Sequence, residues 1–310
     1  MFVVRYRKIW FILSAILIAL SAYAVFAYGF NLSIDFKGGT ITEIRYDGER
    51  PDKELLEMDL KTLGIGGFSL RPSESDRYVI RTKELSEDER RGLQTLLSKN
   101  QLIFTVERQN TIGPTAGAEL KSKAMKAIAV VVVMIVLFIT FAFRKVSNAG
   151  LPRASRGVSS WKYGLATIVA LAHDVIIPTG VFVLLGHFME VEIDLLFITG
   201  LLAILGYSVH DTIVVFDRVR ENLRVNAGQN LSEDFEITVG KSVAQTFGRS
   251  INTSLTIFIT LLALYLVGSP ATKDFAFLLI IGVIVGTYSS IFVASPLLVT
   301  FHKLQRNRGS

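Results

Sequence analysis

Apolar residues along this chain of 310 residues fall into blocks, and charged stretches separate one block from the next. A block of about 20 apolar residues is long enough for a helix to cross the hydrocarbon core of a membrane. The buried strands of a soluble α/β enzyme would need only about 4–8 apolar residues each. The pattern therefore predicts a membrane protein with an all-α bundle of six helices, at residues 9–30, 122–143, 163–185, 195–217, 250–268 and 275–301.

The first block follows a short basic segment, residues 1–8, and this combination also occurs in secretory signal peptides. The length of the block, about 20 residues, exceeds the apolar region of a signal peptide and is typical of a membrane-spanning helix. We therefore expect a retained first helix.

A polar segment, residues 31–121, lies between the first two blocks and is large enough for one small domain. Alternating apolar positions indicate strands, and a capping-box pattern at Ser86 and Glu89 indicates the start of a helix. The expected order is a strand at 40–47, a helix at 51–63, strands at 68–71 and 78–82, a helix at 86–98 and a strand at 102–108. This βαββαβ order predicts an inserted α+β domain of the ferredoxin-like kind.

The net charge of +6 comes from basic residues that flank the apolar blocks. Lys and Arg are gathered near the N-terminus, in the loops at 144–162 and 218–249, and in the tail at 302–310, whereas the connections at 185–195 and 268–274 are nearly free of them. Basic loops stay in the cytoplasm, so both termini are expected there and segment 31–121 is expected outside. No basic–aromatic module accompanies the charge, which argues against nucleic acid as a partner.

The chain has no cysteine, which excludes disulfides, cysteine-based zinc sites and thiol catalysis. It also has no nucleotide-binding motif, because Gly38 and Gly39 lack the remainder of a phosphate-binding loop. We expect no enzyme activity and no cofactor or metal. The energy for any work is expected to come from an ion gradient, of protons or of sodium.

The fourth block contains an acid, Asp211, before its apolar run has ended. A carboxylate inside a membrane-spanning segment costs about 2.5–3.5 kcal/mol on insertion scales, so such a group usually has a task or a partner. The alternative is a helix end at which Asp211 reaches the lipid headgroups. Residues 213–216 continue the apolar run, which favours a submerged acid, and Asp217 and Arg218 are then expected to mark the solvated cytoplasmic edge.

A second candidate is the His173-Asp174 pair near the middle of the third block. Adjacent residues point about 100° apart on a helix, so we expect that the two side chains do not line one pathway. Of the two, Asp174 is favoured as the functional residue, and a packed, satisfied histidine is the simpler interpretation of His173.

In the fifth block, Arg249, Thr253, Thr256 and Thr260 share one helical face. One interpretation is a hydrogen-bonding face between helices. The other is that Arg249 is the counter-charge of Asp211, because both lie at the cytoplasmic side of adjacent antiparallel helices and opposite buried charges stabilise each other.

Taken together, four motifs make the chain resemble the SecD/SecF family of protein-export membrane proteins, which is related to the resistance-nodulation-division (RND) superfamily. They are Ile34-Asp35-Phe36-Lys37-Gly38-Gly39-Thr40, Ile112-Gly113-Pro114, His173-Asp174 and the long motif at 206–222. The resemblance implies a six-helix half-transporter in the bacterial plasma membrane, with a periplasmic ferredoxin-like domain. SecD would supply the other half, and the pair would associate with the SecYEG channel and with translocating polypeptide.

The resemblance also implies roles for individual residues. Asp211 would be the essential membrane acid and Arg249 its functional partner, in a protein that uses the proton-motive force to assist late stages of export. Asp35, Gly38 and Gly39 belong to the family motif that follows the first helix. Relatives often carry Asn at the position of His210, so the resemblance gives that residue no protonic role.

Two other functions remain open at this point. One is a small-molecule proton antiporter of the RND kind, for which a polar segment of about 90 residues is small. The other is a structural translocon subunit without ion coupling, in which Asp211 and Arg249 only clamp two helices together.

Overall fold

The computed structural model describes residues 2–73, 75–98, 103–143, 158–229, 231 and 233–307. The chain forms two compact units. The first, here called the helical unit, comprises Met1–Asn31, Ala127–Val191 and Leu196–Ser310; the second, the α/β unit, comprises Leu32–Lys126 and Glu192–Leu195. The predicted loop at 144–162 and the tail at 302–310 lie partly outside the described residues.

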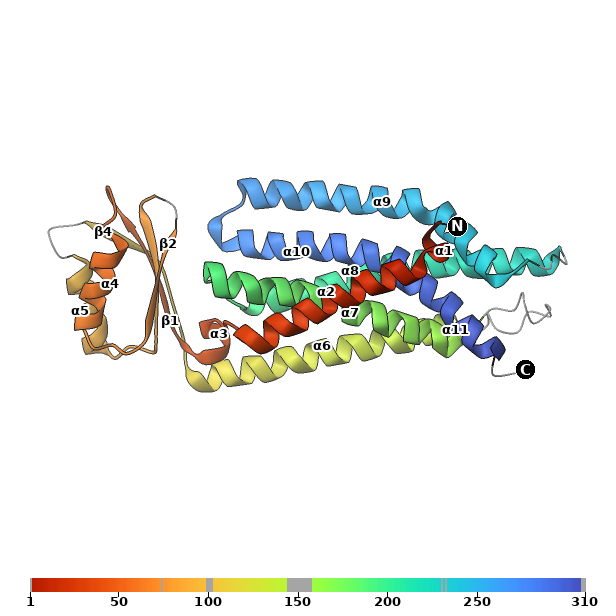
Figure 1. Ribbon diagram of the computed structural model, residues 1–310. Coiled ribbons are helices and arrows are strands. Elements are labelled where there is room, and N and C mark those ends of the chain that lie inside the picture. The colour runs from red at the N-terminus through yellow and green to blue at the C-terminus, as the bar shows by residue number, and fades with distance from the viewer. Residues whose placement is uncertain are drawn as a thin grey trace. The chain divides into compact units, whose positions relative to one another are not determined.

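The six predicted apolar helices are confirmed (Figure 1). They are α2 (Arg7–Tyr28), α6 (Pro114–Ala142), α7 (Ser160–Met189), α8 (Leu195–Gly228), α9 (Phe235–Val267) and a sixth, Thr272–Gln305, that spans several elements. Most run beyond the predicted blocks, because charged residues continue the helices past their apolar stretches. A short helix, α1 (Phe2–Arg5), precedes α2.

The sixth helix contains one turn of π-helix. It consists of α10 (Pro270–Ser289), η2 (Ser290–Ala294) and α11 (Ser295–Asn307). Pro296 has no N–H to offer to the carbonyl four residues earlier, which explains why regular hydrogen bonding is interrupted here. The Ser295 hydroxyl instead donates to the Ser290 carbonyl, five residues back, at 2.9 Å.

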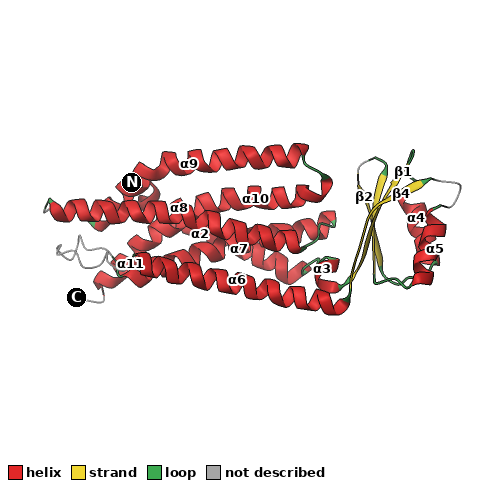
Figure 2. Ribbon diagram, turned by 180° about the vertical axis from the view of Figure 1, so that it is seen from behind, coloured by secondary structure: helices red, strands yellow, loops and turns green. Residues whose placement is uncertain are grey.

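The helices of the helical unit differ in how deeply they are packed. Within their apolar stretches, 50% of α7, 50% of α8 and 61% of the sixth helix are buried, against 17% of α2, 11% of α6 and 11% of α9. In both ribbon views α9 and α6 lie at opposite edges of the bundle (Figures 1 and 2). The inner helices therefore hold the core, and the outer helices present apolar side chains to their surroundings.

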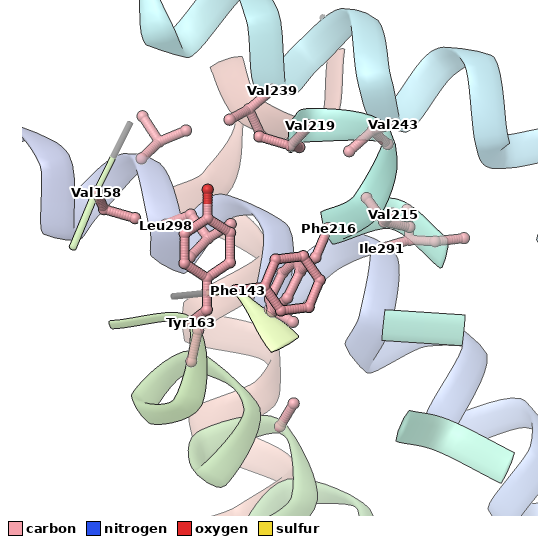
Figure 3. Close-up of a cluster of buried hydrophobic side chains, with 14 of the residues drawn as sticks. Phe143, Val158, Tyr163, Val215, Phe216, Val219, Val239, Val243, Ile291 and Leu298 are labelled. Atoms are coloured by element: carbon pink, nitrogen blue, oxygen red, sulfur yellow. The ribbon is translucent and has the colours of Figure 1, made fainter. Parts of the chain in front are cut away.

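An aromatic cluster holds one end of the bundle together (Figure 3). The rings of Phe143 and Tyr163 stack with centroids 5.1 Å apart, and Phe216 packs edge-on against both. At the end where α1 and α11 lie, Glu236 at the start of α9 forms ion pairs with Arg7, at 2.7 Å, and with Lys303. The two ends of the chain are thus tied to the same end of the bundle.

Gly282 and Gly286 of α10 let α8 approach closely, as their small-xxx-small spacing predicts. A Cβ atom added at Gly282 would collide with the Ile204 side chain, and one at Gly286 would lie 3.1 Å from the Cβ of Ser208. This close approach places the polar residues of α8 beside those of α10.

The α/β unit contains a four-stranded antiparallel sheet with strand order β2-β3-β1-β4. Its elements follow one another as β1 (Gly39–Tyr46), α4 (Lys53–Thr62), β2 (Phe68–Ser73), β3 (Arg77–Thr82), α5 (Glu87–Leu97) and β4 (Phe104–Ile112), and a short helix, α3 (Ile34–Lys37), precedes β1. Figure 1 shows α4 and α5 on the same face of the sheet, over a core that includes Ile44, Leu60 and Ile80. The capping box at Ser86 and Glu89 is present.

Candidate functional site

Asp211 is buried in α8, with 2% of its surface exposed. The side chain of Ser250, in α9, lies beside its carboxyl group. Neither the Oδ2 atom of Asp211 nor the Oγ atom of Ser250 has a hydrogen-bond partner among the described residues. A buried polar oxygen without a partner is costly, so this is a position where a proton, a water or an ion would find an open acceptor.

The predicted ion pair between Asp211 and Arg249 is absent from the described part of the structure. Arg249 is exposed and forms no ion pair there. The expectation that α9 runs beside Asp211 holds, but the helix presents Ser250 to the acid. One residue corresponds to about 100° of helix rotation, which is enough to turn Arg249 away.

The hydroxyls of Thr253, Thr256 and Thr260 do not link helices within the described chain. Each donates to the backbone carbonyl four residues earlier in α9, at 2.9–3.0 Å. The predicted hydrogen-bonding face therefore has its donors satisfied inside its own helix, and the inward face of α9 is formed by Ser250 and Ser254.

Asp174 is fully buried and is the centre of a hydrogen-bonded group that joins three helices. Its Oδ2 atom accepts from the Ser208 hydroxyl of α8 and, at 2.7 Å, from the Ser289 hydroxyl of α10. Its Oδ1 atom lies 2.9 Å from Nδ1 of His173. Both carboxyl oxygens of Asp174 are therefore engaged by neighbouring side chains.

His173 and Asp174 contact each other through their side chains, although adjacent residues of a helix point about 100° apart. That the two do not line one pathway stays a prediction. The His173 ring stacks on Tyr288, with centroids 5.7 Å apart, and its Nε2 atom has no hydrogen-bond partner in the described chain. His173 and Asp174 therefore belong to one polar group.

A second group of hydroxyls links α8, α9 and α10. The Ser254 and Thr287 hydroxyls lie 2.6 Å apart, and the Tyr207 hydroxyl lies 2.6 Å from that of Ser254. Next to Asp211, the Thr212 hydroxyl lies 2.8 Å from that of Ser290 in the π-turn. Hydroxyls can donate and accept at once, so such chains can reorient when a neighbouring charge changes.

Asp217 and Arg218 lie on the more exposed turns of α8. Asp217 pairs with Arg220, and Arg218 pairs with Glu221 at 2.6 Å. These are ordinary ion pairs three residues apart on a helix, as expected for a solvated edge. His210 is exposed next to Asp211.

In the α/β unit, Asp35 caps the start of α8. Its Oδ2 atom accepts from the backbone N–H of Leu195 at 2.9 Å, and the backbone N–H of Ser33 donates to the carbonyl of Ile193 at 3.0 Å. A carboxylate at a helix N-terminus satisfies an otherwise free donor and complements the helix dipole. The segment before β1 is therefore bonded to the first residue of the helix that carries Asp211.

Gly38 and Gly39 are required by their backbone conformation and by close approach. Both have positive φ, 78° and 137°, and a Cβ at Gly38 would lie 2.9 Å from the Cα of Pro114. A Cβ at Gly39 would collide with the carbonyl oxygen of Thr82. The two glycines bring β1, β3 and the start of α6 together.

An ion pair reinforces this region, because Glu192 lies 3.0 Å from Nε of Arg81. Burial raises the pKa of Glu192, although the nearby positive charges of Arg81, Lys37 and Arg71 act in the opposite direction. No group of three His, Asp or Glu side chains that could hold a metal ion is found in the described ranges.

The six apolar helices and the acids enclosed by them define a multi-pass membrane protein with ionisable groups inside its bundle. The family model described as "Protein export membrane protein SecD/SecF, C-terminal" matches residues 93–151 and 158–304, and the "SecD/SecF GG Motif" model matches residues 23–49. The chain therefore belongs to the SecD/SecF family of protein-export membrane proteins.

Individual relatives agree with this assignment. The protein translocase subunit SecF of Thermobaculum terrenum is 38% identical, over 96% of this chain and 93% of that protein. A crystal structure of SecDF from Thermus thermophilus, described as a translocon-associated membrane protein, has a TM-score of 0.82 at 33% identity and covers 97% of this chain. The chain spans 38% of that longer protein. The curated relative is thus named as a protein translocase subunit, and the solved one is described as associated with the translocon.

Sequence reasoning did not single out the serines that surround the two acids. Ser208 lies inside the long motif of the fourth block, and Ser289 and Ser290 lie in the sixth apolar run. Small polar residues in an apolar run are a signal that could have identified them, but serine also packs helices without any further role. Only the packing separates the two cases.

Proposed function

We propose that this chain is the SecF half of a SecDF-type complex that uses the proton-motive force to assist protein export through the SecYEG channel. The observation that carries the proposal is the buried Asp211 carboxyl in a membrane-spanning helix, whose Oδ2 atom has no hydrogen-bond partner in the part of the chain that the structure describes. Intramembrane acids of this kind mark proton and ion pathways. SecD is the expected partner half, because SecDF of Thermus thermophilus contains a matching stretch within a longer chain.

In this proposal both termini lie in the cytoplasm and the α/β unit is a ferredoxin-like domain in the periplasm. The basic loops support this orientation, and the βαββαβ order with sheet order β2-β3-β1-β4 supports the domain type. The periplasmic domain would contact the emerging polypeptide.

The proposed cycle begins with an ionised Asp211 that attracts Arg249. Since α9 already runs beside Asp211, a rotation or shift of α9 brings Arg249, the neighbour of Ser250, towards the acid. A proton on Asp211 removes the attraction, and Arg249 turns outward as it does in this structure. In passing from one arrangement to the other, α9 shifts against α8. A movement of α8 is passed to the α/β unit by Leu195, the first residue of α8, whose N–H is bonded to Asp35. Sodium in place of the proton would act on the same carboxyl.

The Asp211→Asn variant tests the proposal, beside SecD and SecYEG in membrane vesicles. It should abolish the proton-motive stimulation of export and the proton current while the complex still assembles. Asp217→Asn is the matched control, since it removes an exposed acid of the same helix and should leave both readouts near wild type. Normal export by Asp211→Asn would reject the mechanism, and currents that follow sodium and not pH would change the ion.

A purely structural role predicts a different outcome. If Asp211 and Arg249 only clamp two helices, each single variant should lose assembly, and exchange of the two charges should restore it. If they couple ions, assembly survives in the single variants and exchange does not restore export.

A further inference from the structure

The Ser289 hydroxyl has two acceptors within reach and only one hydrogen to give. Its Oγ atom lies 2.7 Å from Oδ2 of Asp174 and 3.1 Å from the backbone carbonyl oxygen of Gly286. Both acceptors are buried, so the hydroxyl cannot turn to water. Which acceptor receives the hydrogen must therefore depend on the protonation state of Asp174.

We propose that Ser289 is a proton-dependent switch, which donates to Asp174 when that carboxylate is ionised and to the Gly286 carbonyl when Asp174 carries a proton. This inference rests on the proposed ion-coupled function and adds a second acid, with its own switching residue, to it. Ser289 acts as a positioning residue, because it responds to the proton without holding it.

In both protonation states, the hydroxyl hydrogens of Ser208 and Ser289 and the carboxyl group of Asp174 keep hydrogen-bond partners. An ionised Asp174 only accepts, and it accepts from Ser208, from Ser289 and from the Nδ1–H of His173. When a proton binds Oδ2, the new O–H donates to Oγ of Ser289, and the hydrogen of Ser289 turns to the carbonyl of Gly286. Ser208 continues to donate to the remaining lone pair of Oδ2. One proton enters, and no covalent bond breaks.

The groups around Asp174 favour the carboxyl as the place for this proton. His173, on the same helix, has a buried Nε2 atom without a partner in the described residues, and a protonated ring would leave a buried N–H unpaired there. From α10, Tyr288 faces the pair with its ring, and its hydroxyl donates to the Trp10 carbonyl of α2. Around Ser208, α8 carries the titratable residues Tyr207, His210 and Asp211, and α2 contributes the uncharged Trp10 and Ser14, which bond to Tyr288.

The switch acts on the backbone next to the π-turn. The carbonyl of Gly286 also accepts from the N–H of Ser290, and that N–H is shared with the carbonyl of Thr287. A hydroxyl that arrives at Gly286 competes for this carbonyl, and the shared N–H can move to Thr287. Ser290 is the first residue of η2, so protonation of Asp174 changes the helix where its hydrogen bonding is already irregular.

The same residues lead from Asp174 to the surroundings of Asp211. The Thr287 hydroxyl bonds to Ser254 at 2.6 Å, one turn from Ser250, and the Ser290 hydroxyl lies 2.8 Å from that of Thr212. A change of pitch at 287–290 therefore moves groups on both sides of Asp211. The sixth helix would couple the two acids without any direct contact between them.

Infrared difference spectra of the full chain in lipid nanodiscs, acidic minus neutral, test the switch. Wild type should show a protonated carboxyl band that disappears in Asp174→Asn, together with a backbone amide change. Ser289→Ala should shift the carboxyl band to higher frequency, because the acid loses its acceptor, and should abolish the amide change. Ser208→Ala is the matched control: it should alter the carboxyl band but retain the amide change.

Ser289→Thr keeps a hydroxyl and should keep both signals, which guards against a Ser289→Ala protein that fails to fold. The inference is overturned if Asp174→Asn retains every component of the wild-type carboxyl signal, so that none belongs to Asp174, or if a folded Ser289→Ala protein retains the amide change. These spectra do not depend on export. A negative spectral result therefore rejects the switch alone, whereas normal export by Asp211→Asn rejects the proposed function.

Discussion

Asp174 in α7 and Asp211 in α8 are both buried in the same bundle, with 0% and 2% of their surface exposed. Both oxygens of Asp174 are hydrogen-bonded to neighbouring side chains, whereas Oδ2 of Asp211 has no partner in the described structure. Buried polar groups whose hydrogen bonds are all formed make a core rigid and specific. A buried polar group without a partner destabilises the fold, and a bound proton, ion or water can remove that penalty. Asp174 therefore joins three helices through hydrogen bonds and can take a proton only if those bonds rearrange, whereas Asp211 has an acceptor that is already open.

The largest expected effect comes from removing the satisfied acid. Asp174→Ala removes the acceptor of Ser208 and His173 and one of the two acceptors of Ser289, and should lower the free energy of unfolding by about 2–4 kcal/mol. Asp211→Ala removes a group without such partners and should cost much less. Unfolding equilibria of the purified proteins in bicelles compare them, and equal losses would remove the distinction between the two sites.

A smaller effect is expected from the serines beside each acid. Ser208→Ala removes a donor to a buried carboxylate and should cost about 1–2 kcal/mol. Ser250→Ala removes a hydroxyl whose Oγ has no partner among the described residues, and should change stability by less than about 0.5 kcal/mol. The same unfolding measurement compares the two variants. A larger loss of stability in Ser250→Ala would mean that the Ser250 hydroxyl bonds to Asp211 in the membrane.

Arg249→Ala tests whether Arg249 forms an ion pair with Asp211 in the purified protein, when no ion gradient is present. Because Arg249 is exposed and unpaired with Asp211 in this structure, the variant should change the free energy of unfolding by less than about 0.5 kcal/mol. Breaking a buried ion pair would instead cost about 3–5 kcal/mol. Arg224→Ala, at an exposed position of α8, serves as the control for loss of a surface arginine.

The smallest change in stability is expected for Glu192, a carboxyl group of the α/β unit that forms an ion pair with Arg81. Burial raises the pKa of Glu192 above its ordinary value of 4.5, so the folded state favours the protonated form. This contribution to stability is fully present below pH 4.5, the pKa of the unfolded state, and is lost as the pH rises through the higher pKa of the folded state. Glu192→Gln does not titrate, so its stability relative to wild type should increase from acidic to neutral pH, as thermal unfolding across pH will show. A relative stability that falls with pH would mean that the Arg81 pair outweighs burial.

The apolar blocks were enough to predict the six helices, because a run of about 20 apolar residues has few other uses. They did not predict the helix ends, since charged residues such as Arg220 and Lys241 lie inside α8 and α9 beyond the apolar blocks. The site was predicted only in part. Asp174 and Asp211 could be found from the cost of burying an acid, but the choice of Ser250 over Arg249 depends on one residue of helix rotation, which packing decides.

The π-turn lay beyond sequence reasoning for a related reason. Hydrophobic periodicity assumes about 3.6 residues per turn, and one wider turn before Pro296 changes which of Ser289 and Ser290 meets which helix. Consecutive serines can then bond to two different partners, Asp174 and Thr212.

The bond between Asp35 and Leu195 has a consequence for how the protein is made. The two residues are 160 positions apart, and Glu192–Leu195 form part of the α/β unit, where Ile193 bridges to Leu32. A chain synthesised from its N-terminus cannot complete this unit until the connection between α7 and α8 has reached the same side of the membrane. A chain with that hairpin inserted the wrong way round would keep an unfinished domain, which gives quality-control proteases a means to recognise it.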